Sequence, residues 1–307
     1  MTTRRAYTTG HFALDIDGNA LRTAHIKSVE GGHVKLNSVD EQMGQDNLRI
    51  KHGTSLEVEP LTCEIGLSQA NYLLWWIKKS WRKEFARHNG SITHADFQYK
   101  AQFVHQFFDA LIEETQFPTL DSQSKDPAYL KVKFRPERVD MKRGGGESVS
   151  GSFGGKQKLW LSSAFRLTID GVDTSKVSKI DAFSVKQGIK PIASGPARFP
   201  ELVPTKIEFP DLSVTMSLQY ADQVLDWYHQ YVIDGKMNQT KAEKQGALEF
   251  LTPDRQEVLF RINLYDVGIK SFQIPKVEAN QDQIKRCKFE LYVGYMDLDN
   301  DGALGLE

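Results

Sequence analysis

The sequence predicts a mainly β protein made of two fused copies of one unit, each a β-barrel or sandwich with one amphipathic helix. Two observations lead to this prediction. Segments of the first half of the 307-residue chain return in the same order in the second half. Most of these segments alternate apolar and polar residues, as half-buried strands do, and one in each half has helical spacing. The predicted fold class is therefore mainly β with α, arranged as a tandem duplication of one unit.

Three blocks recur along the chain, each at a nearly constant shift. Residues 12–18 return as residues 165–171, 153 positions later. A second block returns after 151 positions and a third after 157 positions. The second pairs Leu61, Ile65, Leu67, Ala70, Leu74 and Trp76 with Leu212, Met216, Leu218, Ala221, Leu225 and Trp227, and the third includes Asp109, Pro118, Lys131 and Asp140 with Asp266, Pro275, Lys288 and Asp297. A repeat of this length indicates a pair of globular units.

The chain divides at a stretch rich in glycine and serine. We expect a first unit over residues 1–142, a flexible linker over 143–159 and a second unit over 160–307. The linker lacks the Gly-Lys-Ser/Thr ending of a phosphate-binding loop.

Each unit is expected to begin with a strand that ends in an Asp-Gly turn, at residues 12–18 and 165–171. A second strand is expected near residues 24–29 and 177–183. Long polar stretches follow over 31–54 and 186–210, and such lengths are typical of functional segments or of segments that a partner orders.

A strand over residues 61–67 or 212–218 is expected to lead into the helix of each unit. We predict that the first helix begins near Gln69 with Ser68 as its N-cap, and that two or three more strands close each unit.

Composition excludes several classes of protein. Residues 1–150 carry 20 basic and 19 acidic side chains, and residues 151–307 carry 19 and 21, so the basic excess typical of nucleic-acid binding is absent. The longest apolar run, residues 72–77, is far shorter than the roughly 20 residues that cross a bilayer. No secretion signal is recognisable at the N-terminus. We therefore expect neither membrane insertion nor sequence-specific nucleic-acid binding.

No residue set predicts catalysis, a cofactor or a metal. Cys63 and Cys287 align with apolar residues of the other copy, which favours buried free thiols. Of the eight histidines only His88 and His94 lie near each other in the sequence, and zinc needs three or four closely spaced ligands. The C-terminal residues 297–302 resemble half a calcium loop but lack its bidentate glutamate, which indicates an acidic tail. Trp76 recurs as Trp227, so we expect it in the core.

Together these segments resemble the phage tail-tube protein family of the contractile-tail type, which includes the inner-tube proteins of contractile injection systems. The resemblance rests on the order of residues 165–171, 212–227, 258–275 and 285–295, and the first copy departs from it through a longer middle, 81–108, that looks more helical. It implies six-fold rings of small β-barrels that join edge to edge around a pore and stack into a tube. By this resemblance, the stretches 31–54 and 186–210 lie where the family's extended hairpin reaches a neighbouring subunit or ring.

The duplication leads to three functional hypotheses. The first is a structural protein that forms a homotrimer ring with pseudo-six-fold symmetry, or a homohexamer, as a tube, tube-initiator or baseplate-hub component. It would be made in a bacterial cytoplasm and would bind tail-tube, spike or baseplate proteins. The second is a monomeric two-barrel ligand-binding protein or enzyme with its site in the cleft between the units. The third is a monomeric scaffold or chaperone.

Overall fold

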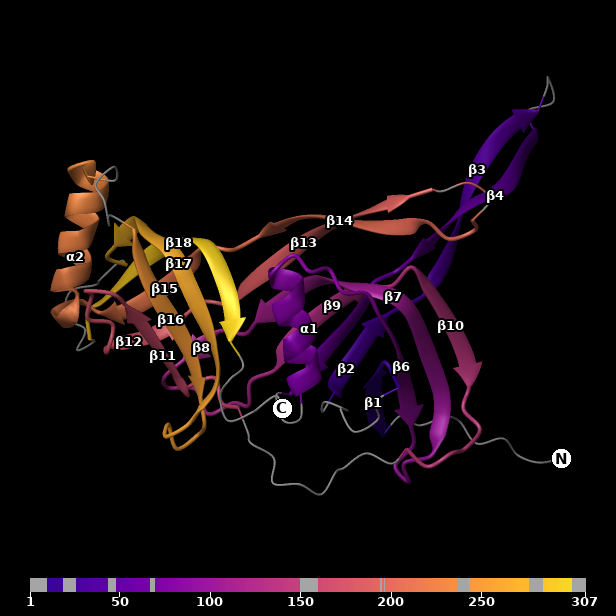
Figure 1. Ribbon diagram of the computed structural model, residues 1–307, viewed down its shortest axis with the longest axis horizontal. Helices are drawn as coiled ribbons and strands as arrows, with labels where there is room; N and C mark the ends of the chain where they lie inside the picture. Colours follow the sequence, from indigo (N-terminus) through magenta and orange to yellow (C-terminus); the bar gives the residue numbers. More distant parts are fainter. Residues whose placement is uncertain are drawn as a thin grey trace.

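The computed structural model describes residues 10–18, 26–43, 48–66, 70–149, 160–193, 195, 197–236, 243–275 and 284–299. Within these residues the chain forms two β-rich units that lie next to each other, each carrying one α-helix (Figure 1). The predicted fold class, mainly β with a helix in each of two tandem units, is confirmed.

The first unit is an antiparallel sheet that curls on itself. Its strands follow the order β1 (His11–Ile16), β6 (His88–Ala95), β7 (Ala101–Phe117), β9 (Leu130–Arg135), β5 (Leu61–Ile65) and β2 (Ile26–Gly31). The two end strands, β1 and β2, contact each other, so the sheet is barrel-like and its apolar face is enclosed. A further strand, β10 (Arg138–Arg143), pairs with the first part of β7.

The second unit repeats this order. Its strands are β11 (Phe165–Ile169), β16 (Lys244–Leu251), β17 (Val258–Gln273), β18 (Arg286–Asp299), β15 (Leu212–Ser217) and β12 (Val177–Ile180). The long β18 takes the places of both β9 and β10. The irregularities repeat as well: Asp109 in β7 and Asp266 in β17 both have a positive φ, of 51° and 52°. The sequence repeat is therefore a repeat of structure.

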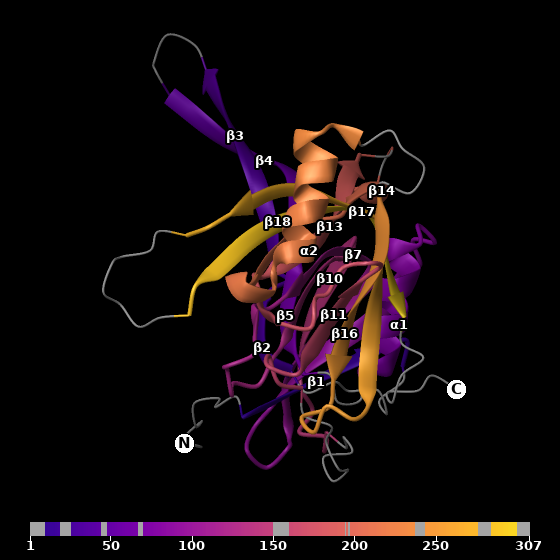
Figure 2. The same cartoon turned by 90° about the vertical axis from the view of Figure 1, so that its left-hand side faces the viewer.

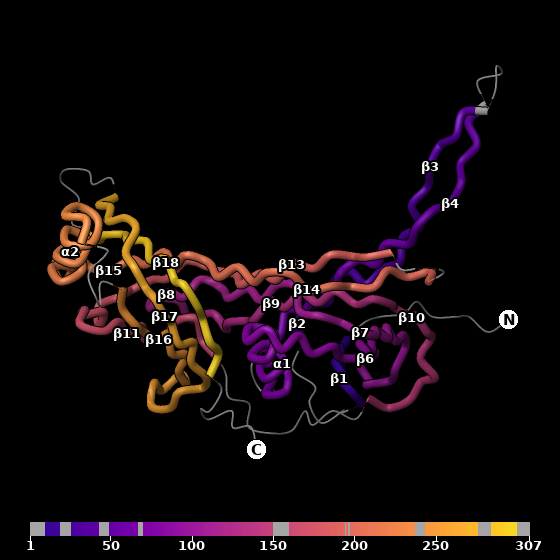
Figure 3. The backbone as a smooth tube through the Cα atoms, turned by 45° about the horizontal axis from the view of Figure 1, so that its top comes forward, coloured from indigo at the N-terminus to yellow at the C-terminus, as the bar shows by residue number. Residues whose placement is uncertain are grey.

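Both long polar stretches are β-hairpins. The first consists of β3 (Val34–Met43) and β4 (Leu48–Val58), and the second of β13 (Phe183–Ile192) and β14 (Glu201–Glu208). Figure 3 shows that β13–β14 runs back along the first unit, whereas β3–β4 extends away from the body. Among the described residues β3 and β4 form a sheet of their own.

The helices are α1 (Asn71–Trp81) and α2 (Asp222–Tyr228), the latter continued by a π-helical turn, His229–Ile233, and preceded by a 3-10 turn, Leu218–Tyr220. The predicted N-cap Ser68 and start Gln69 lie outside the described residues. The helix begins at Asn71, after Ala70, without a side-chain cap hydrogen bond.

The expectation of a more helical middle in the first unit is wrong. After α1 ends at Trp81, this region consists of β6 and β7. Gly90 shows how closely β6 packs on β1: a Cβ at this position would lie 2.3 Å from the carbonyl oxygen of Asp15. Gly246 meets Thr168 of β11 in the same way. The glycine lets β6 approach β1 closely.

The core contains most of the described residues that the repeat marked as apolar, among them Leu61, Leu74, Leu212 and Met216. Trp76 and Trp227 are buried, as predicted, and Cys63 and Cys287 are buried free thiols. Burial raises the pKa of the Cys63 thiol, which keeps it protonated and unreactive. No helix among the described residues is long and apolar enough to cross a membrane.

The predicted boundaries of the units remain a prediction. β10 ends at Arg143, inside the expected linker, and residues 150–159 lie outside the described part of the chain. Residues 300–302 of the expected acidic tail also lie outside it, while Asp297 and Asp299 belong to β18.

Candidate assembly interface

The two units exchange strands where they meet. The end of β7 pairs antiparallel with the start of β13, from Phe117 opposite Phe183 to Glu114 opposite Lys186. In return the short strand β8 (Leu120–Asp121), which follows β7, pairs with β12 of the second unit. Phe117 stacks on Phe183 with 4.9 Å between ring centroids, and both rings are buried. Each unit thus contributes a strand to the sheet of the other unit, and the junction has its own apolar core around Phe117 and Phe183.

A helix of the first unit docks on the last strand of the second. Arg82, at the end of α1, donates two hydrogen bonds to Asp297 of β18, from Nε to Oδ1 at 2.8 Å and from Nη2 to Oδ2 at 2.7 Å. These bonds raise the pKa of the Arg82 guanidinium above its usual value. One turn earlier, Lys78 lies 3.9 Å from the carboxylate of Asp299. Two-point contacts of this kind fix orientation as well as position.

The α1 helix also meets the incoming hairpin. The hydroxyl of Ser80 donates a 2.6 Å hydrogen bond to the side-chain oxygen of Gln187 in β13, and both residues are buried. Further along, the backbone N–H of Leu202 in β14 donates to Glu137, and Arg87 donates to the carbonyl of Leu202. The second hairpin is thus fastened to the first unit along its length.

The repeat places a second, unused set of the same surfaces at the two ends of the molecule. The end of β17 corresponds to the end of β7, and the base of β3–β4 corresponds to the base of β13–β14. The two hairpins have the same register. Lys35 lies opposite Glu57 in the first hairpin, and the residues 151 positions later, Lys186 and Glu208, lie opposite each other in the second. Both hairpins have a β-bulge two residues further on, after Leu36 and after Gln187.

The equivalent positions differ sharply in exposure. Val185 and Gln187 are 3% and 5% exposed in the internal junction, whereas their counterparts Val34 and Leu36 are 39% and 53% exposed. At the other end, Phe117 is fully buried and its counterpart Ile274 is 55% exposed. Among the described residues, β17 beyond Val267 pairs only with β18. Exposed apolar residues beside an unpaired strand edge are typical of an interface.

The helices show the same difference. The outer face of α1 is partly covered by the second unit, while the outward residues of α2 and its π turn, including Ile233 in the position of Arg82, are exposed. Figure 2 looks onto α2, which lies across the outside of the second unit. The counterpart of the acidic end of β18 is β10, whose Asp140 takes the place of Asp297 and is exposed. In Figure 1, α2 and β10 lie at opposite ends of the molecule.

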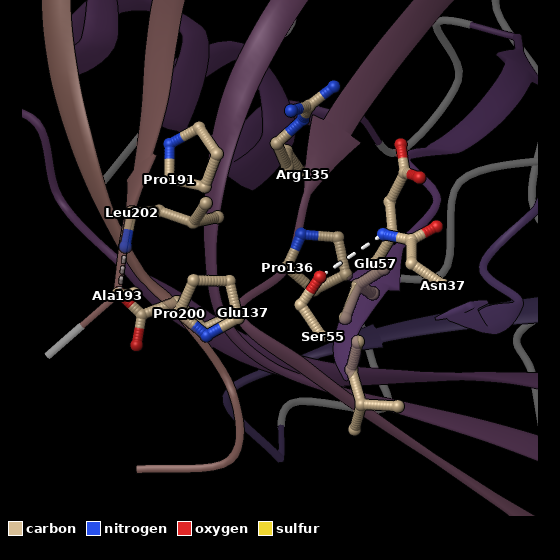
Figure 4. A pocket seen from close by; sticks show the side chains of 12 residues that line it. Asn37, Ser55, Glu57, Arg135, Pro136, Glu137, Pro191, Ala193, Pro200 and Leu202 are labelled. Carbon is tan, nitrogen blue, oxygen red and sulfur yellow. Dashed lines mark hydrogen bonds between the residues drawn. The ribbon is translucent and has the colours of Figure 1, made fainter. Parts of the chain in front are cut away.

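Two cavities lie between the units, where the ligand-binding hypothesis placed its site. One, of about 320 Å³, lies between the two hairpins and the turn after β9, and Figure 4 shows its lining residues, including Pro136, Pro191, Leu202 and Glu57. The other, of about 630 Å³, lies beside β8 and is lined by several charged residues, among them Lys27, Glu64, Asp121 and Lys179. Neither lining brings together a nucleophile and a histidine.

Several histidines lie in clusters for which the sequence analysis made no prediction. His88 and His94 lie at opposite ends of β6, and His94 lies instead beside His105, with His33 on the other side of His105 at 6.1 Å between ring centroids. Burial, and then the charges of His94 and His33, lower the pKa of His105 to about 4. No group of described residues has an arrangement that could hold a metal ion.

His88 belongs to a different cluster, with Asp17 and Tyr72. The Tyr72 hydroxyl donates a 2.7 Å hydrogen bond to Asp17, whose carboxylate also bonds to His88 Nδ1. Partial burial raises the pKa of Asp17, but these hydrogen bonds outweigh it and lower that pKa overall. The cluster fastens the turn after β1 to α1 and β6. Sequence spacing could not reveal either cluster, because their members come from separate strands, turns and a helix.

Comparison with known proteins gives one family. The family model described as T4-like virus tail tube protein gp19 matches the chain twice, over residues 8–140 and 161–297. No curated protein sequence matches the chain.

Several solved structures have similar chains. A chain of the anti-feeding prophage baseplate, from a structure symmetrised six-fold, is 15% identical, covers 46% of this chain and 98% of its own, and has a TM-score of 0.40. A chain from the sheath–tube complex of the extracellular contractile injection system PVC is 15% identical. It covers 45% of this chain and 93% of its own, and has a TM-score of 0.37. Hcp1 from Flavobacterium johnsoniae is 12% identical, covers 45% of this chain and 97% of its own, and has a TM-score of 0.27.

The two segments of the family match correspond to the two barrel-like units, so the repeat in sequence, the repeat in structure and the family assignment coincide. The chain belongs to the T4-like virus tail tube protein family as a tandem duplication of that family's unit, and it is a structural tail protein.

Proposed function

We propose that the protein closes into a ring of three chains, in which six units follow one another with pseudo-six-fold symmetry. The observation that carries this proposal is the internal junction: the chain already contains one unit-to-unit contact and exposes the matching surfaces at its two ends. A contact between two different surfaces is head-to-tail, and such contacts either close into a ring or extend as a filament. A ring of three chains would satisfy every strand edge of this kind.

The role that follows is structural. Such a ring would serve as a tube, tube-initiator or baseplate-hub component, bound to tail-tube, spike or baseplate proteins, after synthesis in a bacterial cytoplasm. Fusion lets the two units diverge, so that one can contact a three-fold partner and the other a six-fold partner. The family is one of structural tube proteins, and we propose no catalytic residue, cofactor or metal for this chain.

Mass photometry of the purified protein across a concentration series, with negative-stain electron microscopy of the same samples, tests this function. We expect particles of three times the 34.8 kDa chain mass with a central pore. Particles of six chain masses would support the related hexamer, with two stacked rings of units. Monomers at every concentration would contradict self-assembly.

One observation favours the alternative, a monomeric ligand-binding protein: the cavity of about 320 Å³ in Figure 4 is within the size range of small-molecule sites. A monomer whose melting temperature rises with a small molecule, and no longer rises in Ala193→Trp, would support this alternative. Ala193 lines that cavity and is exposed, so the larger side chain would obstruct it without disturbing the core.

A further inference from the structure

The second barrel is sealed by aromatic side chains where the first unit meets it. The ring of Phe117, from the end of β7, lies with its centroid 5.6 Å from that of Phe250 and 6.3 Å from that of Phe260. Trp160 packs edge-on against the same two rings of the second unit. All three phenylalanines are fully buried. This part of the second barrel therefore contains apolar rings that water does not reach.

The same part of the first barrel holds histidines. In the strand registers His94 takes the place of Phe250, because each lies opposite the phenylalanine of the first strand of its unit. His105 takes the place of Ile262 by the same comparison of β6–β7 with β16–β17. The first barrel thus has ionisable side chains where the second barrel has apolar ones.

A third histidine completes this group, which we call the three-histidine cluster: His33, His94 and His105. The ring centroids of His33 and His105 are 6.1 Å apart, and those of His94 and His105 are 5.5 Å apart. Among the described residues, both ring nitrogens of His105 and the Nε2 atom of His94 lack a hydrogen-bond partner. Imidazoles this close to one another repel when they are charged, so the cluster favours the neutral form.

The cluster has apolar neighbours on the surrounding strands and charged neighbours only at exposed positions. Within the described part of the chain, the strand neighbours are Phe12, Phe103 and Met141. Arg143 of β10 lies opposite Phe103 and is exposed. Glu59 donates a 2.9 Å backbone hydrogen bond to the carbonyl of His33, and its side chain is exposed. A charged imidazole in this cluster therefore depends on water for much of its stabilisation.

We propose that the three-histidine cluster makes the contact between chains of the ring sensitive to acid, whereas the contact between the two units of one chain is insensitive. The residue equivalent to Phe117 is Ile274, 157 positions later, which is the shift of the third repeat block. In the ring, Ile274 of a second copy would cover His94 and Phe103 as Phe117 covers Phe250 and Phe260. This inference rests on the proposed ring, and it adds regulation of that contact by protons.

The direction of the effect follows from which imidazoles lose water on assembly. His105 is only 5% exposed in the single chain, so assembly changes its surroundings little. His33 is exposed and His94 is half-buried, and a second copy that covers them removes water from both. Burial disfavours a charged imidazole, and partial burial already lowers the pKa of His94. The ring therefore binds fewer protons than the free chains, and assembly weakens as the pH falls.

The internal junction lacks groups of this kind at the equivalent positions. The residues that take the places of His33, His94 and His105 are Ser184, Phe250 and Ile262. None of these side chains gains a proton in mildly acidic solution. Acid should therefore open the contacts between chains, leave the contact within each chain closed, and release whole folded chains.

Mass photometry across a concentration series at pH 7, 6 and 5 tests this inference. We expect the concentration of half-assembly to rise at least about tenfold from pH 7 to pH 5, because histidine ordinarily titrates near pH 6.5. The released particles should have the single-chain mass of 34.8 kDa. They should retain the tryptophan fluorescence of the folded protein at pH 5 and form rings again at pH 7.

Histidine variants separate this cluster from other titrating groups. We expect His33→Ser with His94→Phe, which installs the residues of the second unit, to keep the rings at pH 5. His33→Ser alone changes an exposed side chain and should reduce the slope of the logarithm of half-assembly concentration against pH. The matched control is His52→Ser, which removes an exposed histidine of the β3–β4 hairpin outside the cluster and should leave that slope unchanged.

The outcomes distinguish this inference from the proposed ring. Rings that persist at pH 5 in the unaltered protein would overturn the acid response while the ring remains. An unchanged slope in His33→Ser, or equal dissociation of the double variant, would do the same by assigning the response to other groups. Monomers at every pH and concentration would overturn both proposals. Dissociation into folded single chains that the double variant resists would establish the acid-sensitive contact.

Discussion

The two helices of this protein have equivalent places in equivalent units, but only one of them is covered. The α1 helix is held by Asp297 and Gln187 of the second unit, whereas the outward face of α2 is exposed. The hairpins differ in the same way, because β13 is paired with β7 whereas, within the part of the chain that the structure describes, β3 is paired only with β4. One chain thus contains the same interface in its formed state and in its open state.

This difference teaches how duplication changes assembly. In the internal junction the partner is always present, because it belongs to the same chain, so that contact contributes to folding of the single chain. The outer surfaces can contribute only at a concentration where a second chain is available. Paired substitutions at equivalent positions should therefore separate folding from assembly.

The largest expected difference is between Phe117 and Ile274. Phe117→Ala should lower the free energy of unfolding by about 3–5 kcal/mol, because the ring is fully buried against Phe183 and Phe250. Ile274→Ala should change it by less than about 0.5 kcal/mol, since that side chain is exposed in the single chain. Urea unfolding at a concentration below assembly measures both. An equal loss in the two variants would contradict the comparison.

The next largest effect is a pH dependence of stability that we expect from the interior of the first unit and not from that of the second. His94 and His105 occupy positions that hold Phe250 and Ile262 in the second unit. The pKa of His105 is about 4 in the folded state against an ordinary value of 6.5, so the unfolded state binds more protons between these values. The contribution of His105 to the free energy of unfolding is therefore fully present above about pH 6.5 and is lost as the pH decreases toward 4.

His105→Ile, which installs the residue of the second unit, should reduce this acid sensitivity. Unfolding followed by tryptophan fluorescence from pH 7 to 4 measures it. His52→Ile, at an exposed position of the β3–β4 hairpin, is the matched control and should leave the pH profile unchanged. An unaltered profile in His105→Ile would assign the acid sensitivity to other groups.

The smallest effect concerns Asp297 and Asp140, which occupy equivalent positions in the two units. Asp297→Asn should lower the free energy of unfolding by about 1–2 kcal/mol, because it weakens two charge-assisted hydrogen bonds from Arg82, whose side chain remains partly exposed to water. Asp140→Asn, at the equivalent exposed position, should have almost no effect on the single chain. The free energies come from the same urea experiments, and a loss at Asp140 as large as that at Asp297 would indicate that β10 is already covered.

Sequence patterns were reliable where they reported burial and unreliable where they reported conformation in a polar segment. The recurrence of Trp76 as Trp227 correctly placed both in the core, because a buried position tolerates few residue types. The β3–β4 hairpin showed no clear strand signal, since most of its described side chains on both faces are exposed to solvent. The region after Trp81 looked helical because its β-bulges and turns disturb the two-residue alternation of β6 and β7.

By itself the sequence determined that the chain holds two copies of one mainly β unit, that each copy has an amphipathic helix, and that the family is that of the tail tube. The first two properties follow from the repeat and from the spacing of apolar residues within each copy, and the family follows from the resemblance of segments such as 165–171 and 212–227 to that family. Only the tertiary structure decided which copy supplies the partner of α1, and that β13 completes the edge of β7. Those contacts join residues more than 60 positions apart, and backbone hydrogen bonds between strand edges carry no signature in the side chains that a sequence records.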